Sequence, residues 1–457
     1  MSKVLLVAGM GYGDEGKGSI VDFLCREQKA GLVVRYNGGA QAAHNVVLDD
    51  GRHHTFSQFG SGTFNAGCRT HLSRFMLVNP VSMESEEKHL ATLGITDAYA
   101  RMTVEREAFV TTPFHVALNR MREMSRGDGR HGSCGMGIGE TMADSLAYPH
   151  DMLRVGDLDH EPTMWRKLTY TQDRMREKAR EIVNGLTGSR PDSFYKEWDL
   201  IGDTDTVSCC IPYYKRFHER VRFVDNDYLA AVLRDSVTVF EGAQGVLLDQ
   251  DFGFQPYTTW TDCTFGNALK LIDGFDGLVE RLGVLRAYMT RHGAGPFVSE
   301  SRAFDKCSEG DHNGLGAWQG TFRSGAFDFV ATDYALNVIQ GVDGLAFTHI
   351  DRINLLTEPH GSFGAKGIPT CLAYDVKKAF ENMDPLPGHT NRLDVVRPVD
   401  LDHQAKVAEA LFRVKPRIET FLGTDIEYVT NIAGLLKVPV KITSHGPRAS
   451  DKRRIEG

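Results

Sequence analysis

A glycine-rich segment near the N-terminus has the composition of a phosphate-binding loop. It reads GMGYGDEGKGS, Gly9 to Ser19, and follows a short apolar stretch. Backbone N–H groups of such a turn converge on an anion, while Lys17 and the N-terminus of a following helix add positive potential. The segment fits the first part of the P-loop pattern, but Gly18 stands where Ser or Thr would hold magnesium. Asp14 and Glu15 lie inside the loop, and a carboxylate among phosphates must either hold a metal or take up a proton.

A second candidate is His44, in the segment VVRYNGGAQAAHNVV. An isolated histidine in a small, apolar run is usually a hydrogen-bonded core residue. Because this one closely follows a phosphate loop, we favour a role as a positioned donor to phosphate.

Further polar residues follow apolar runs later in the chain. Gln244, in FEGAQGVLLDQD, has an amide that both donates and accepts, which suits a base edge. Asp351, in FTHIDR, could accept two N–H bonds from guanine, although a helix N-cap or a salt bridge explains it equally well. Thr259, in PYTTWTDCT, is a candidate phosphate ligand, and Ser133 and Cys134 lie in a glycine-rich turn that is a weak signal by itself.

The composition is that of a soluble globular protein, with 41% hydrophobic and 25% charged residues among 457. A formal net charge of −8 argues against nucleic acid as a partner. No apolar run is long enough to cross a bilayer, the N-terminus lacks a signal-peptide layout, and the eight cysteines form no Cys-x-x-Cys pair. We therefore expect a cytoplasmic protein with reduced thiols and no membrane contact.

Short runs rich in Val, Leu and Ile predict the strands that position these residues. They are Val4–Ala8, Leu32–Tyr36, Val237–Phe240, Leu282–Met289, Leu345–Ile350 and Val438–Ile442. Several end at Gly-, Asn- or Asp-rich turns and alternate with helical patterns, which is typical of an α/β fold with a central, mostly parallel sheet flanked by helices. Ligands of such sheets gather at the carboxyl ends of the strands.

Residues 1–457 are predicted to form one large P-loop-like domain with two embellishments. Residues 150–235 contain a charged, helix-favouring stretch, which predicts a helical insertion that covers the sheet. Residues 309–325 are glycine-rich with little periodicity and predict a mobile binding loop.

The ordered series of motifs resembles the adenylosuccinate synthetase family. The motifs are GDEGKG, RYNGG…AAH, GxGIG, FEGAQGxLLD, TRxGAGPF, a strand ending in an aspartate, and SxGP, in order from Gly13 to Pro447. The resemblance implies a homodimeric, single-domain α/β ligase of purine biosynthesis that joins IMP and aspartate with GTP and Mg²⁺.

The resemblance also implies catalytic roles. Asp14 would remove the N1 proton of the purine, so that O6 attacks the γ-phosphate of GTP, and would ligate magnesium together with Ala43. Lys17 would neutralise the phosphates, His44 would stabilise the transferring phosphoryl group, and Gln244 would contact the purine.

Binding residues are carried over in the same way. Those expected at GTP are Gly13, Glu15, Gly16, Lys17, Gly18, Asp351, Ser444, Gly446 and Pro447. Those expected at the purine nucleotide are Asp14, Gln41, Ser133, Cys134, Gln244 and Thr259, and those expected at the amino acid, within the 309–325 loop, are Gln319, Thr321 and Arg323.

The chain departs from the family pattern around the acceptor and the amine. Gln41 replaces an asparagine, Cys134 replaces a phosphate-binding threonine, and the region that supplies the partner subunit's arginine ends near Tyr148. The amino-acid loop keeps Arg323 as its one clear guanidinium and adds Trp318. The hypotheses are an ordinary family enzyme, a specialised paralogue with another purine or amine, and an inactive GTP-binding regulatory protein. A generic P-loop kinase is the remaining alternative, and Gly18 argues against it.

Overall fold

A large β-sheet forms the centre of the computed structural model, which describes residues 2–308, 318–357, 367–376 and 389–455. Ten of the described strands form this sheet, and every adjacent pair is parallel except β19–β20. In spatial order they are β20 (Lys452–Arg454), β19 (Val440–Ser444), β15 (Gly344–Thr348), β11 (Leu278–Arg286), β1 (Lys3–Gly9), β10 (Val237–Gly245), β2 (Leu32–Arg35), β5 (Arg69–Leu72), β7 (Met102–Glu105) and β9 (Arg222–Val224). The predicted α/β class is confirmed.

The central strands are apolar because both of their faces are covered. In β1, Val4 and Leu6 face one apolar cluster and Leu5 and Val7 face another. Alternate side chains of a strand point to opposite faces, so a strand buried on both sides needs a continuous hydrophobic run. The six predicted strands all contribute to this sheet, although the run predicted at Leu282–Met289 covers the end of β11 and the first residue of β12.

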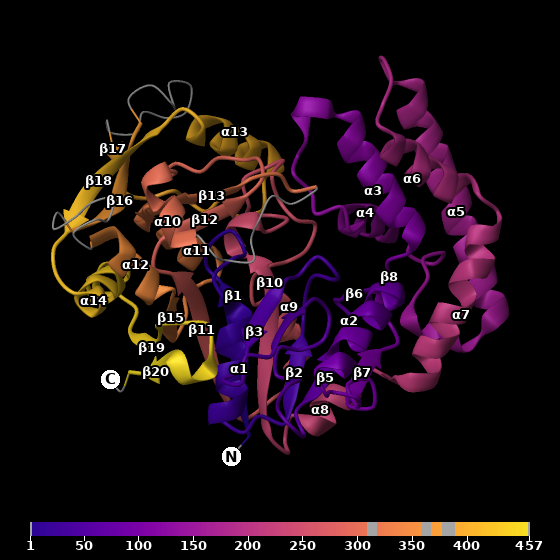
Figure 1. Ribbon diagram of the computed structural model, residues 1–457, viewed down its shortest axis with the longest axis horizontal. Helices are drawn as coiled ribbons and strands as arrows, with labels where there is room; N and C mark the ends of the chain where they lie inside the picture. The colour runs from indigo at the N-terminus through magenta and orange to yellow at the C-terminus, as the bar shows by residue number, and fades with distance from the viewer. Residues whose placement is uncertain (1, 309–317, 358–366, 377–388, 456–457) are drawn as a thin grey trace.

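Helices cover the two faces of the sheet, and smaller β units flank it (Figure 1). The helices are α1 (Lys17–Glu27), α2 (Pro80–Thr92), α3 (Pro113–Ser125), α4 (Ile138–Ala147), α5 (Glu161–Asn184), α6 (Asp192–Gly202), α7 (Asp205–Arg220), α8 (Tyr228–Val232), α9 (Gly266–Leu271), α10 (Asp305–Ser308), α11 (Phe329–Val338), α12 (Ile350–Thr357), α13 (Leu401–Leu411) and α14 (Asp425–Leu436). The flanking strands are β3 (His44–Val47) with β4 (His53–Phe56), β6 (Leu77–Val78) with β8 (Phe109–Val110), β12 (Met289–His292) with β13 (Phe322–Gly325), and the group β14 (Phe327–Asp328), β16 (Ile368–Asp375), β17 (His389–Thr390) and β18 (Lys415–Phe421).

Residues 150–235 are largely helical, with α5, α6 and α7 forming an outer layer. α5 and α6 pack against α3, and α7 packs against α2 (Figure 1). The chain then returns to the central sheet as β9, which pairs with β7. The sequence did not predict β9, because a strand of three residues carries no measurable periodicity.

The strand order places one crevice at the carboxyl edge of the sheet. β1 lies between β10 and β11, and the chain runs from β1 to β2 on one side of this point and from β11 to β15 on the other. Ligands of doubly wound sheets bind at such a switch point. The loops that follow β1, β2, β10, β11, β15 and β19 all meet at this edge.

Two expectations from composition concern bilayers and thiols. In the part of the chain that the structure describes, no helix combines the length and apolarity that a bilayer crossing requires. The eight cysteines are all free thiols.

Candidate active site

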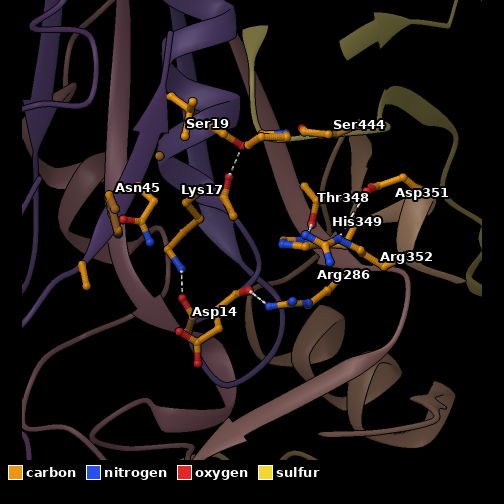
Figure 2. A pocket seen from close by; sticks show the side chains of 18 residues that line it. Asp14, Lys17, Ser19, Asn45, Arg286, Thr348, His349, Asp351, Arg352 and Ser444 are labelled. Carbon is orange, nitrogen blue, oxygen red and sulfur yellow. Dashed lines mark hydrogen bonds and ion pairs between the residues drawn. The ribbon is translucent and has the colours of Figure 1, made fainter. Parts of the chain in front are cut away.

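A cavity of about 210 Å³ lies at the carboxyl edge of the sheet (Figure 2). The predicted residues that line it are Gly13, Asp14, Gly16, Lys17, Gly18, Ala43, His44, Asp351, Ser444, Gly446 and Pro447. The predicted residues outside its lining are Glu15, Gln41, Ser133, Cys134, Gln244, Thr259, Gln319, Thr321 and Arg323. The cavity therefore brings together the residues expected at GTP and at the reacting phosphate.

An ion pair stabilises the loop after β1 from within. The Glu15 carboxylate accepts N–H bonds from Gly11 at 2.9 Å and Gly13 at 2.7 Å, and lies 2.7 Å from Lys17 Nζ. Lys17 Nζ also donates to the Gly13 carbonyl at 2.8 Å. Both side chains are buried. Glu15 as a GTP contact stays a prediction, and in the structure its carboxylate is used inside the loop.

Asp14 projects from the same loop into the cavity. Its backbone carbonyl accepts a hydrogen bond from Arg286 Nη1 at 3.2 Å, and its Oδ2 lies 3.9 Å from His292 Nε2. Burial raises the pKa of the Asp14 carboxyl, outweighing the nearby positive charges. A carboxylate with a raised pKa is a stronger base, which suits proton abstraction from a lactam nitrogen.

His44 is oriented by a buried carboxylate. Its Nδ1 lies 2.5 Å from Glu241 Oε1, and Glu241 also accepts bonds from the hydroxyl and the N–H of Ser61. Burial raises the pKa of Glu241, but Arg35 and His44 outweigh it and bring the value down to about 2. Burial lowers the pKa of His44, so Nδ1 of the neutral ring donates to the ionised Glu241. Nε2 is then the ring nitrogen left for a ligand.

The close approach of α1 to His44 explains Gly18. A Cβ at this position would lie 2.7 Å from His44 Cβ and 3.0 Å from the His44 backbone carbon. The residue that replaces the P-loop Ser or Thr therefore makes room for a histidine.

Gly18→Ala is expected to lower kcat about tenfold, because displacement of His44 weakens its alignment, and to destabilise the fold by about 1–3 kcal/mol through overpacking. Steady-state rates and thermal unfolding measure the two effects. The matched control is Gly434→Ala in α14, where nothing lies within 4 Å of the added methyl. That variant should gain up to about 1 kcal/mol from helix propensity. Equal behaviour of the two variants would contradict the steric explanation.

Gln244 and Gln41 lie together beside the loop. Gln244 is the next-to-last residue of β10 and has φ 54°, and its Cα lies 3.5 Å from the position that a Cβ on Gly13 would occupy. Gln244 Oε1 lies 3.2 Å, and Gln41 Nε2 lies 3.3 Å, from the position that a Cβ on Gly38 would occupy. A glutamine in the left-handed region is strained, and such strain clusters at binding sites. Both amides remain predicted contacts of the purine nucleotide.

The strand ends β15 and β19 form the far end of the cavity. Thr348 Oγ1 donates to the Glu15 carbonyl at 2.6 Å, which ties β15 to the phosphate loop. His349 has φ 57° and lies against Gly16. Burial, with Arg286 nearby, lowers the pKa of His349 well below its usual range, so its imidazole is neutral.

The residues expected at the acceptor phosphate lie apart from the cavity. Ser133 Oγ accepts hydrogen bonds from the Asn119 side chain at 3.0 Å and the Gly135 N–H at 3.3 Å. Burial raises the pKa of Cys134 to about 11, so its thiol is neutral. Thr259 donates its N–H to Leu248 at 2.8 Å. As nucleotide contacts, the three stay predictions.

The described part of the amino-acid loop runs beside the turn that contains Ser133. The Gln319 carbonyl lies 3.5 Å from the Cβ position of Gly132, and the Thr321 carbonyl accepts the N–H of Gly293. Phe322–Gly325 is the strand β13 rather than loop, because it pairs with β12. Residues 309–317 lie outside the described part.

Arg323 is held by its surroundings. Its Nη1 lies 2.7 Å from Glu300 Oε2, and its Nη2 donates to the carbonyls of Gly293 at 2.7 Å and Gly295 at 2.9 Å. These contacts use three of the five N–H groups of the guanidinium, and the buried Nε–H has no hydrogen-bond partner among the described residues.

Three titratable residues near the site were not predicted from the sequence. Glu241 lies in the FEGAQG motif, Arg286 is the last residue of β11, and His292 is the variable position of TRxGAGPF. A polar residue at the carboxyl end of an apolar strand was the available signal for Arg286.

The chain was also compared with known proteins. The family model described as adenylosuccinate synthetase matches residues 6–453. The adenylosuccinate synthetase of Vibrio cholerae is 31% identical over 456 residues, which cover 98% of this chain and 97% of that protein.

Two solved structures share the fold. Fully ligated adenylosuccinate synthetase from Plasmodium falciparum aligns with TM-score 0.75 at 22% identity, covering 99% of this chain and 100% of that one. Succinoaminodeoxyadenylate synthetase of cyanophage S-2L, bound to dGMP and to dATP as an energy donor, aligns with TM-score 0.60 at 15% identity, covering 100% of this chain and 96% of that one.

Proposed function

We propose that this chain, which belongs to the adenylosuccinate synthetase family, uses GTP to activate the 6-oxo group of a purine nucleotide for attack by an amine. The membership makes it a ligase that forms adenylosuccinate or an analogue at the expense of a nucleoside triphosphate. IMP and aspartate are the first candidates for acceptor and amine. The observation that carries the proposal is Asp14, a carboxylate of raised pKa that lines the cavity beside the phosphate loop.

In the first step, Asp14 accepts the N1 proton of the lactam. The electrons released make O6 the nucleophile, the bond from O6 to the γ-phosphorus forms, and the bond from that phosphorus to the leaving GDP oxygen breaks. Arg286 holds the Asp14 backbone, which fixes the position of the base. Without this activation the 6-oxo group is a poor leaving group.

His44 and the loop amides act on the transferred phosphoryl group. Nε2 of His44 donates to a phosphoryl oxygen once the ring takes up a second proton, and the ionised Glu241 compensates the resulting charge. The charge of Lys17 is shared with Glu15, so the backbone N–H groups of the loop carry much of the phosphate binding.

Magnesium fits the residues present. Within the described ranges no group of three or more His, Cys, Asp or Glu side chains could hold an ion. Asp14 and Ala43 both line the cavity beside the phosphate loop, and Mg²⁺ binds through one or two carboxylates together with substrate phosphates. Asp14 and the backbone carbonyl of Ala43 are the proposed ligands. The bound ion would neutralise phosphate charge.

In the second step, the amine nitrogen bonds to C6 and inorganic phosphate leaves with O6. A specialised paralogue with another amine is the second candidate, favoured by one observation. Arg323 is already bonded to Glu300 and to two backbone carbonyls. A dicarboxylate normally needs bidentate cationic partners.

Phosphate release with a matrix of substrates tests the proposal. The nucleoside triphosphates are GTP and ATP, the acceptors are IMP, GMP and dGMP, and the amines are aspartate and other amino acids. GTP cleavage that needs both IMP and aspartate supports the family reaction. Dependence on another acceptor or amine supports the paralogue. Triphosphate binding without turnover under any combination would support the regulatory protein instead.

We also propose that the chain is a homodimer that takes small molecules as its substrates. Leu146 is 72% exposed and Tyr148 is 40% exposed at the end of α4. This is the region where the family's partner subunit approaches the acceptor phosphate. Light scattering of the wild type and Leu146→Asp measures the oligomeric state.

A further inference from the structure

Two side chains of opposite charge lie next to each other at the end of the cavity that is expected to bind the guanine base. Asp351 and Arg352 lie in the first turn of α12, directly after β15. Both line the cavity, and Arg352 Nε lies 3.4 Å from Asp351 Oδ2 (Figure 2). Their side chains are 35% and 29% exposed, so a ligand can reach both. The pair offers an acceptor next to a donor.

The neighbouring cations have other partners. Arg286 donates to the Asp14 carbonyl and, at 2.6 Å, to the Tyr288 hydroxyl. Lys452 donates to the carbonyls of Gly446 at 3.0 Å and Arg448 at 2.9 Å, which shapes the turn after β19. The imidazole of His349 is neutral, so it brings no charge to this end. Arg352 lines the same cavity and lies beside Asp351, at 3.4 Å.

Guanine and adenine present opposite patterns to such a pair. Guanine has an acceptor at O6 followed by donors at N1 and N2, whereas adenine has a donor at N6 and an acceptor at N1. Arginine to guanine O6 is a common specific contact in base recognition. A carboxylate that accepts from N1 and N2 therefore leaves O6 for an adjacent guanidinium. Adenine in the same position would face donor against donor and acceptor against acceptor.

We propose that Arg352 is a specificity residue for the triphosphate, donating to guanine O6 while Asp351 accepts from N1 and N2. This assignment rests on the proposed use of GTP. It divides base recognition between two adjacent side chains, so each can be tested with a nucleotide that lacks one group.

Calorimetric titration of the full chain measures the assignment by binding, independently of the acceptor and the amine. The ligands are GTP, the triphosphate of 6-thioguanosine, which keeps N1–H and the 2-amino group but carries sulfur, a weaker acceptor, in place of O6, and ITP, which lacks the 2-amino group. Wild type should bind GTP about tenfold more tightly than the 6-thio nucleotide, the effect of one hydrogen bond to a charged group. In Arg352→Leu this preference should vanish, because GTP and ITP, which both carry O6, bind more weakly while the 6-thio nucleotide binds as before.

Asp351→Asn is the matched variant. It should reduce the preference for GTP over ITP, because the 2-amino group loses the negative charge of its acceptor. Arg352→Lys keeps a charge and should recover part of the preference for O6, and circular dichroism checks that each variant is folded.

Two results would overturn the assignment of Arg352. If Arg352→Leu weakened the binding of all three nucleotides equally, Arg352 would act on the phosphates or on the stability of the fold. If the binding of all three were unchanged, Arg352 would have no role in base recognition. If the wild type bound none of the triphosphates, the proposed function itself would fail.

Discussion

Asp14→Asn is expected to lower kcat by about 10³-fold, within the range for loss of a general base, while GTP binding is largely retained. The asparagine amide keeps the size of the side chain but cannot accept the N1 proton. Because the Asp14 backbone is held by Arg286, the loop should keep its shape. Stopped-flow phosphate release measures the rate, and calorimetry measures nucleotide binding.

The pH dependence of the wild type supplies a second readout for Asp14. The base must be deprotonated, so kcat/KM should rise with pH through the pKa of Asp14 and be lost below it. Burial raises that pKa, so the acid limb should lie above the usual range of an aspartate. Near-normal turnover in Asp14→Asn, or an acid limb at the usual carboxyl value, would remove Asp14 from the base role.

Glu241→Gln is expected to lower kcat by about 10²-fold, as loss of the partner that orients a functional histidine does. Glutamine has no charge to hold Nδ1–H of His44 or to compensate a protonated ring. Single-turnover rates with saturating substrates measure the chemical step. Ser61→Ala is the control, because it removes one hydrogen bond to Glu241 and leaves the His44 contact in place. Equal losses in the two variants would show a general packing defect.

The same substitution should destabilise the fold by about 1–3 kcal/mol, the cost of weakening buried hydrogen bonds to a charged group. Arg35 and His44 lower the pKa of Glu241 to about 2 against the effect of burial. A carboxyl with a depressed pKa stabilises the native state above the pKa of the unfolded chain. That contribution is lost as pH falls toward about 2. Urea unfolding at neutral pH should therefore separate the variant from wild type, and at low pH the difference should shrink.

The sheet and its loops could be predicted because their signals are local. Leu32–Arg35 and Val237–Phe240 are short apolar runs, which only strands buried on both faces require. The glycine-rich segment after Val4–Ala8 placed Asp14 and Lys17 at the edge where ligands bind. The family motifs then supplied their proposed roles.

The partners of the site residues could not be predicted in this way. His44 and Glu241 are 197 residues apart, and only the parallel pairing of β2 with β10 brings their segments together. The Glu15 side chain points back into its own loop, because two backbone N–H groups of the folded loop bind its carboxylate. In the sequence Gly18 departs from the P-loop pattern without an explanation. The folded structure explains it, because His44 lies too close for a side chain at position 18.

The arrangement of strand ends at the sheet edge also bears on how such an enzyme can change its substrates. The phosphate loop follows β1, Asp351 and Arg352 follow β15, and Arg323 lies on β13, which pairs with β12 outside the central sheet. The residues proposed for phosphate binding, base recognition and amine binding therefore lie on separate chain segments. Replacing one segment can alter the preference for one substrate while the residues for phosphoryl transfer keep their positions. Changes in one loop can therefore alter one substrate of the reaction while the reaction itself stays the same.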